Sequence, residues 1–329
     1  MRVFHSFTEI AAAKLQQVYL TIGNFDGVHL GHQAILAELD RRAAAGNGQT
    51  LLVLFEPQPL EVFANSVPRI FTLEDKLQAL SQHQLVDNVL VLDFNQELAN
   101  TQAQDFVAKI CQSMQVHTIF IGDDFHFGKN RQGSFKLLEQ LAPQYNYQVD
   151  LIDTIKTSDA SEQRVSSTLI RLFLKENKLA SANKLLAQPF AFVGKVEAGM
   201  QLARKLNSPT ANMPINRKLS PLHGVYACLV QIEQDPTYYA GVSNIGFKPT
   251  VTDDQAHWVV ETYIYNFSGD LYGKKLKVIP VEFVRPELKF ASIDELKEYI
   301  EADKQYVENL NLLEQLKTKG LAQLFVDKN

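Results

Sequence analysis

The sequence predicts an α/β domain with a parallel sheet, followed by a small antiparallel β-barrel that carries a terminal helix. Strand-like and helix-like segments alternate through the first half at roughly thirty residues per repeat, which is typical of βαβ crossovers. Beyond Gln188-Pro189 the pattern changes to short strands separated by turns, as in a small barrel. With 329 residues the chain is also long for a single core. We therefore expect one domain over residues 1–187 and a second over residues 188–329.

The first domain contains five strand-like runs that are rich in apolar and β-branched residues. These runs are Tyr19–Ile22, Leu51–Phe55, Asn88–Leu92, Thr118–Ile121 and Gln148–Ile152. Helices are expected between them, at Gln33–Ala45, Thr72–His83, Thr101–Met114 and Ser134–Leu141. Thr72 and Thr101 each have a polar residue three positions further on, so both are expected to be N-caps. In parallel sheets of this kind, ligands bind beyond the carboxyl ends of the strands.

The second domain is preceded by a helical run from Thr168 to about Ala187. Five strands of the barrel are expected at Phe190–Val196, Val225–Ile232, Tyr238–Val242, Trp258–Tyr265 and Leu276–Val284. A charged amphipathic helix at Ile293–Lys317, with breaks, closes the chain.

Composition narrows the class of protein. The net charge is −5, with 32 basic and 37 acidic side chains and no long basic block, which disfavours nucleic-acid binding. No stretch approaches the roughly 20 apolar residues of a membrane span. Cys111 and Cys228 are far apart and lie in apolar surroundings, so they are expected to be core residues rather than a redox pair. We expect a cytoplasmic protein, and the sequence leaves a homo-oligomer open.

Two histidines three residues apart, His29 and His32, form an H-x-G-H motif between the first strand and the first helix. Free backbone N–H groups and the helix dipole favour an anion at such a turn. The pair therefore suits a nucleotidyltransferase, which must hold a triphosphate. Asn24 and Asp26 could fix the histidine tautomers, although a capping role for Asp26 explains its position equally well.

A second anion-binding signature is Ser166-Ser-Thr-Leu-Ile-Arg171. The hydroxyls of Ser167 and Thr168 stand at a helix start, and Arg171 lies one turn further along. A simple N-cap would explain the hydroxyls but not Arg171 on an otherwise apolar face. The loop Gly122–Gly128 is no Walker A motif, because the spacing of its glycines is wrong and Asn130 follows Lys129. Arg131 is a further candidate for phosphate contact.

The barrel contains a carboxylate among apolar and aromatic neighbours. Strand alternation places Glu261 on one face with Val259 and Tyr263, where an unpaired charge is costly unless it is functional. A kinase needs such a group to orient or deprotonate the attacking hydroxyl. Thr210 and Asn212 are short oxygen ligands two positions apart, an arrangement that can hold Mg²⁺ beside nucleotide phosphates.

The H-x-G-H loop, Pro209-Thr-Ala-Asn212, Gly241-Val-Ser-Asn-Ile-Gly246 and Val260-Glu-Thr262 together resemble the bacterial bifunctional riboflavin kinase/FAD synthetase family. The resemblance extends from Gly23 to about Asp303. It implies a Rossmann-like nucleotidyltransferase domain and a riboflavin kinase-like barrel. It also implies that one chain uses ATP and Mg²⁺ to phosphorylate riboflavin to FMN and then to adenylylate FMN to FAD.

The resemblance assigns roles to residues of both domains. His29, His32 and Arg171 would act in adenylyl transfer, Glu261 would be the kinase base, and Thr210 and Asn212 would bind the metal. The remaining candidates for substrate and nucleotide contact are Gly23, Asn24, Phe25, Asp26, Gly31, Asp124, Phe125, Arg131, Ser167, Thr168, Asn244 and Arg285.

One segment departs from the family pattern. Members usually carry a glycine-rich flap before Pro-Thr-Ala-Asn, whereas residues 199–208 contain glycine only at Gly199. This difference predicts weaker ATP binding at the kinase site and leaves open an alternative, an FAD synthetase with a flavin-sensing barrel. Two other classes fit less well: a nucleotidyltransferase for another substrate does not explain the barrel motifs, and a flavin carrier does not explain His29, His32 and Arg171.

Overall fold

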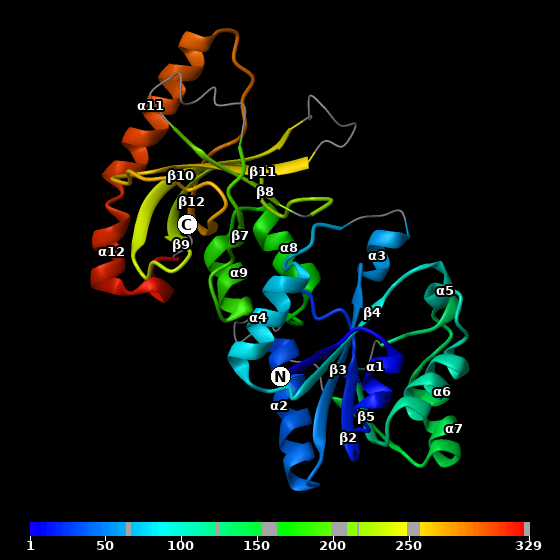
Figure 1. Ribbon diagram of the computed structural model, residues 1–329. Helices are drawn as coiled ribbons and strands as arrows, with labels where there is room; N and C mark the ends of the chain where they lie inside the picture. Colours follow the sequence, from blue (N-terminus) through cyan, green and yellow to red (C-terminus); the bar gives the residue numbers. More distant parts are fainter. Residues whose placement is uncertain are drawn as a thin grey trace. The chain divides into compact units, whose positions relative to one another are not determined.

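The computed structural model describes residues 1–63, 67–122, 125–152, 163–198, 209–215, 217–248 and 257–325 (Figure 1). The chain forms two compact units. The first unit consists of residues 1–67 and 71–167, and the second consists of residues 68–70 and 168–329. None of the helices in the described ranges has both the length and the apolar character that crossing a membrane requires.

The first unit is built on a six-stranded sheet in which every neighbouring pair is parallel. Its strands are β1 (Arg2–Phe4), β2 (Val18–Ile22), β3 (Gln49–Glu56), β4 (Asn88–Asp93), β5 (Val116–Gly122) and β6 (Gln148–Ile152). The sheet order is β1-β4-β3-β2-β5-β6. Its central strands are buried along their length, which agrees with their nearly continuous apolar sequences. The predicted α/β class is therefore confirmed, and among the strands of this sheet only the three-residue β1 was not predicted.

Helices cover both faces of this sheet (Figure 1). They are α1 (Phe7–Ala12), α2 (Leu30–Ala45), α3 (Pro59–Val62), α4 (Leu73–His83), α5 (Gln96–Ala99), α6 (Ala103–Ser113) and α7 (Phe135–Tyr145). Thr72 caps α4 as predicted, and Asp75 completes a reciprocal capping box with it. The prediction for Thr101 is wrong, because its hydroxyl donates to the carbonyl of Glu97 and α6 begins two residues later.

The strand order determines where a ligand can bind. Along the chain, β3 and β4 are added to the sheet in one direction from β2. The chain then returns, and β5 pairs with the opposite edge of β2. The carboxyl ends of β2 and β5 therefore flank the point where the winding of the sheet reverses, which is the usual crevice for a nucleotide. Gly23 follows β2, and Gly122 ends β5, so both predicted loops begin at this edge.

The second unit begins with two helices and continues as an antiparallel sheet. Its elements are α8 (Ser167–Lys175, of which Ser167 belongs to the first unit), α9 (Leu179–Leu186), β7 (Phe192–Lys195), β8 (Ala211–Ile215), β9 (Gly224–Ile232), β10 (Tyr238–Lys248), β11 (His257–Ile264), β12 (Lys275–Arg285), α11 (Ile293–Asn309) and α12 (Leu312–Lys319). The predicted helical run over residues 168–187 is thus two helices, separated near Asn177, whose φ is +59°.

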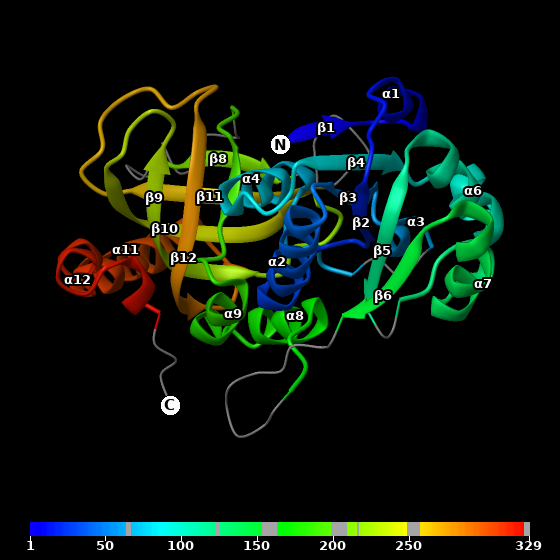
Figure 2. The same ribbon diagram turned by 90° about the horizontal axis from the view of Figure 1, so that it is seen from below.

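The six strands follow the order β7-β12-β9-β10-β11-β8. An isolated bridge between Glu197 and Asn212 joins the segment after β7 to β8 at the other edge, so the sheet closes on itself as a near-barrel. The helices α11 and α12 follow one another along the sheet (Figure 1), and both contact β10. Val307 and Leu312 are buried in a shared apolar cluster with Leu229. Figure 2 shows the same elements from below. The predicted antiparallel barrel with a terminal helix is confirmed.

Candidate active sites in the two units

The H-x-G-H motif forms the start of α2. His29 is the N-cap residue, and its Nδ1 accepts the backbone N–H of His32 at 3.3 Å. The two imidazole rings stack with centroids 3.6 Å apart, and Phe25 stacks on His32 at 4.5 Å. His29 is 4% exposed. The motif therefore presents two aromatic nitrogen heterocycles at a helix N-terminus, where the dipole favours an anion.

The loop that leads into this helix holds an unusual backbone conformation. Phe25, Gly27 and Val28 all have positive φ, at +47°, +87° and +42°. A β-branched residue such as Val28 rarely adopts this region, and strain of this kind is concentrated at functional sites. A side chain at Gly31 would be crowded, because a Cβ there would approach the His29 ring and the carbonyl of Val165 at 3.2 Å. The motif glycine thus allows the imidazole to pack closely against the helix.

Asp26 and Asn24 lie in this loop and contact Phe71, two residues before α4, and α4 itself. The Asp26 carboxylate accepts the backbone N–H of Phe71 at 3.0 Å, and the Asn24 carbonyl accepts from Lys76 Nζ at 2.6 Å. His29 rather than Asp26 caps α2, so the capping interpretation of Asp26 is wrong. A role for either residue in fixing the histidine tautomers stays a prediction.

Ser167 and Arg171 both make contacts with main-chain carbonyls. Ser167 Oγ donates to Asp26 O at 2.8 Å, so the hydroxyl secures the loop before the H-x-G-H motif. Arg171 Nε donates to Pro68 O at 2.7 Å. Thr168 is exposed on the first turn of α8. Asp124 lies outside the described residues.

The loop after β5 contributes aromatic side chains. Phe125 and Phe127 stack with centroids 5.6 Å apart, and Phe127 is buried. Gly128 has a φ of +70° and approaches Ala103 so closely that a Cβ would lie 2.6 Å from its Cα. Arg131 is exposed in the 3₁₀ turn that follows, in a position open to solvent.

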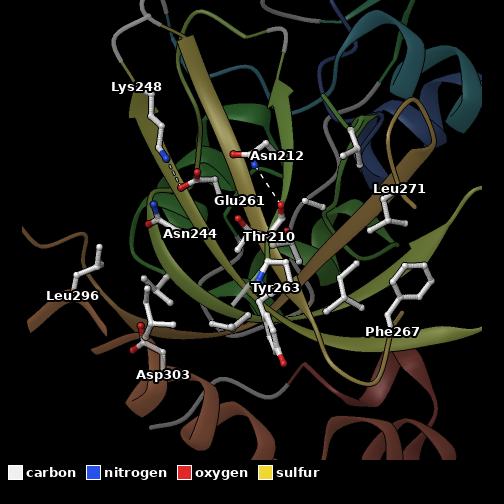
Figure 3. A pocket seen from close by; sticks show the side chains of 18 of the residues that line it. Thr210, Asn212, Asn244, Lys248, Glu261, Tyr263, Phe267, Leu271, Leu296 and Asp303 are labelled. Carbon is white, nitrogen blue, oxygen red and sulfur yellow. Dashed lines mark hydrogen bonds and ion pairs between the residues drawn. The ribbon is translucent and has the colours of Figure 1, made fainter. Parts of the chain in front are cut away.

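The second unit contains a cavity of about 1340 Å³ (Figure 3). Its wall combines polar side chains from the sheet with apolar and aromatic side chains from the β11–β12 connection and α11. Residues of the predicted kinase site that line it are Thr210, Asn212, Asn244, Glu261 and Arg285. The structure thus brings the barrel candidates together in one concave site of the size expected for a small-molecule ligand.

These side chains come from one row of the sheet. Glu261 on β11 is paired with Asn212 on β8 and with Asn244 on β10. Residues directly opposite in neighbouring strands point to the same face, so the carboxylate stands between two amides (Figure 3). Asn212 Nδ2 also donates to the carbonyl of Thr210 at 3.3 Å.

Lys248 at the end of β10 forms an ion pair with Glu261 Oε2 (Figure 3). The two side chains are 32% and 22% exposed, so the ion pair is only partly screened by water. The ion pair holds the Glu261 carboxylate in place in the cavity wall. Sequence reasoning missed Lys248, although it lies four positions after Asn244 and therefore on the same face of an extended strand.

Arg285 contacts α11 rather than the centre of the cavity. Its guanidinium binds the Asp303 carboxylate through Nε and Nη2, at 2.7–3.1 Å, and stacks on Phe290 and Tyr299. This largely buried pair ties α11 to β12 at the rim of the cavity. The sequence carried no signal for Asp303, because the contact depends on how the terminal helix packs.

We expect Asp303→Asn to loosen α11 and weaken the kinase site. The substitution removes the negative charge that accepts hydrogen bonds from Arg285, and such charged hydrogen bonds contribute about 2–3 kcal/mol. KM for riboflavin should therefore rise, while FAD formation from FMN should be unchanged. Steady-state kinetics of both reactions check this, with Asp294→Asn, an exposed residue of the same helix, as control. An equal rise in KM for both variants would contradict the assignment.

Comparisons with known proteins agree with this geometry. The FAD synthetase family model matches residues 11–169, and the riboflavin kinase family model matches residues 186–311. The chain is 41% identical to a bifunctional riboflavin kinase/FMN adenylyltransferase of Pseudomonas fluorescens, over 86% of this chain and 89% of the relative. It is 37% identical to the enzyme of the same name from Escherichia coli K12, over 92% and 96% of the two chains.

A solved structure described as a macrolide-efflux protein from Streptococcus pneumoniae is also similar, with a TM-score of 0.73 and 25% identity over 93% of this chain and 98% of that one. The fold is thus shared along nearly the whole length of both chains. The resemblance noted in the sequence motifs is confirmed. The chain belongs to the family of bifunctional riboflavin kinases/FMN adenylyltransferases, and its two activities produce FMN and FAD.

Proposed function

We propose that the two activities are carried by two separate sites, one in each unit. Adenylyl transfer is assigned to the H-x-G-H loop, and phosphorylation of riboflavin to the cavity of the second unit. The observation that carries this division is the position of Glu261, which lies in the cavity wall between Asn212 and Asn244. No such carboxylate is needed for adenylyl transfer, because the FMN phosphate is itself the nucleophile.

In the first site, an FMN phosphate oxygen attacks the α-phosphorus of ATP, and the bond to the pyrophosphate oxygen breaks. The enzyme must align the two phosphates and stabilise the negative charge on the departing pyrophosphate. His29 and His32 stand at the N-terminus of α2, which suits that task. We assign supporting contacts with the nucleotide and FMN to Gly23, Asn24, Phe25, Asp26, Gly31, Asp124, Phe125, Arg131, Ser167, Thr168 and Arg171.

In the second site, the terminal hydroxyl of the ribityl chain attacks the γ-phosphorus of ATP, and ADP leaves. Glu261 accepts the hydroxyl proton as the new O–P bond forms. Its ion pair with Lys248 supports this role, since the pair holds the carboxylate in place in the cavity wall. Asn244 and Arg285 line the same cavity and are assigned to orienting the flavin.

The donor set of the second site also suits Mg²⁺. Thr210 and Asn212 supply hard oxygen atoms, the ligand type this ion prefers. Within the described ranges, no three His, Cys, Asp or Glu side chains gather closely enough to hold a metal by themselves. The ion would therefore be held jointly by Thr210, Asn212 and the ATP phosphates, whose charge it neutralises.

Two further proposals concern the organisation of the protein. We place the functional boundary between residues 187 and 188, although α9 and nearly all of α8 belong with the second unit by their contacts. The matches to the two family models leave residues 170–185 unassigned, so these helices act as a connection.

A cytoplasmic location is proposed because the protein uses ATP and because both of its cysteines are free.

A time course with riboflavin, ATP and MgCl₂ tests the proposed function. FMN should appear first and FAD should follow, and both should stop when EDTA removes the metal. If riboflavin gave no product while supplied FMN gave FAD, the barrel would be a flavin-sensing module instead. FAD formation without free FMN would contradict two separate sites.

A further inference from the structure

A fully buried lysine lies directly beneath the H-x-G-H loop. Lys76, on α4, is 0% exposed, and its Nζ donates to the carbonyl of Asn24 at 2.6 Å. Lysine is among the residues least often buried, because removing an ammonium from water is costly unless the protein supplies compensating contacts. A structural core position in α4 would be filled more favourably by leucine or methionine. The charge therefore calls for an explanation beyond packing.

The Asn24 carbonyl, which accepts from Lys76, lies directly before the loop residues that have positive φ. Asn24 directly precedes Phe25, the first of the residues with positive φ before His29. Such conformations persist only where the surrounding structure imposes them. A carbonyl fixed by an ammonium forms a charge-assisted hydrogen bond, which is stronger and shorter than a neutral one. Lys76 thus holds the loop at the residue where its unusual path begins.

Other hydrogen bonds hold the same loop, and two of them end on Asp26. The backbone N–H of Phe71 donates to its carboxylate, and Ser167 Oγ donates to its carbonyl. The α4 helix itself is firmly started by the capping box of Thr72 and Asp75. Lys76 therefore contacts the loop from a firmly started helix and supplies a charged donor to it.

We infer that Lys76 is a positioning residue for adenylyl transfer. Its ammonium fixes the Asn24 carbonyl, and the loop in turn fixes the orientation of His29 at the start of α2. The inference rests on the proposed assignment of adenylyl transfer to the H-x-G-H loop. Lys76 is buried under the loop and need not touch a substrate to act in this way.

The test uses the full-length protein with Lys76→Met, which keeps the length of the side chain and removes the donor and the charge. A misplacement of about 1 Å can cost roughly 100-fold in rate, so kcat for FAD formation should fall about 10- to 100-fold. KM for FMN and ATP should change little, because the loss concerns alignment in the transition state. Riboflavin phosphorylation should be unchanged, and amide exchange of residues 24–29 should accelerate.

Leu80→Ala is the matched control for a purely structural role. Leu80 lies one turn further along α4, is 1% exposed, and has no side-chain polar atom with which to hold the loop. This variant should lower the melting temperature as much as Lys76→Met does and retain kcat below the melting transition. Equal loss of kcat in both variants would overturn the inference.

Two more variants keep the outcome decisive. Should Lys76→Met fail to fold, Lys76→Leu takes its place, since it also removes the donor and the charge and fills the buried position with an apolar side chain. Wild-type kcat in either folded variant would overturn the positioning role. His29→Ala distinguishes failure of one proposal from failure of the other. If His29→Ala still forms FAD, the assignment of adenylyl transfer to the H-x-G-H loop is wrong. If His29→Ala loses FAD formation and Lys76→Met does not, only the positioning role of Lys76 is wrong.

Discussion

Replacing His29 by alanine is expected to reduce FAD formation from FMN by about two to three orders of magnitude, while FMN formation from riboflavin continues at its normal rate. The imidazole stands at the N-terminus of α2, and removing one group that stabilises transition-state charge typically has an effect of this size. Chromatographic assay of both reactions on the same purified variant measures the difference directly.

His29→Asn distinguishes a role of His29 in adenylyl transfer from its role as the N-cap of α2. Asparagine is a favoured N-cap residue, so this variant should be more stable than His29→Ala by about 1 kcal/mol and yet equally deficient in FAD formation. His5→Ala, at an exposed position, should behave as wild type. Recovery of FAD formation in His29→Asn would mean that His29 acts only through the start of the helix.

Replacing Glu261 by glutamine is expected to have the opposite pattern. Glutamine keeps the size of the side chain but cannot take the proton of the ribityl hydroxyl, so FMN formation should fall about 10²- to 10⁴-fold. FAD formation from supplied FMN should be unchanged, because that reaction is assigned to the other unit. Initial rates with each flavin as substrate check both statements.

Glu287→Gln is the matched control for this experiment. Glu287 also lines the cavity and accepts from Asn244, but it lies outside the row that pairs Glu261 with Asn212. Its replacement should lower the rate of FMN formation far less than Glu261→Gln does. If the two variants were equally impaired, the reaction would depend on the charge of the cavity rather than on one base.

The sequence was most informative where periodicity and turn chemistry acted together. The five predicted strands of the parallel sheet lie within two residues of their predicted bounds, because long apolar runs between helices leave few alternatives. β8 was missed because Ala211–Ile215 contains Asn212 and Pro214, both unfavourable in strands. Its formation depends on pairing with β11, a contact that no local pattern reveals.

The candidate sites show the same limit. The motifs placed His29 and Glu261 correctly at a helix start and on a strand, since short motifs carry local geometry. Lys248 was missed because the predicted strand ended at Val242, before Gly246, a residue type that weakens a strand pattern. Lys76 and Asp303 act through contacts 52 and 18 residues away in sequence, and side-chain type alone does not predict such pairs.

The most direct test of two separate sites is to mix two variants that each lack one activity. His29→Ala alone should convert riboflavin to FMN and stop, and Glu261→Gln alone should leave riboflavin almost unchanged. An equimolar mixture with ATP and MgCl₂ should produce FAD after a lag, because FMN released by the first variant is adenylylated by the second. A mixture that accumulates FMN without forming FAD would contradict independent sites linked by free FMN.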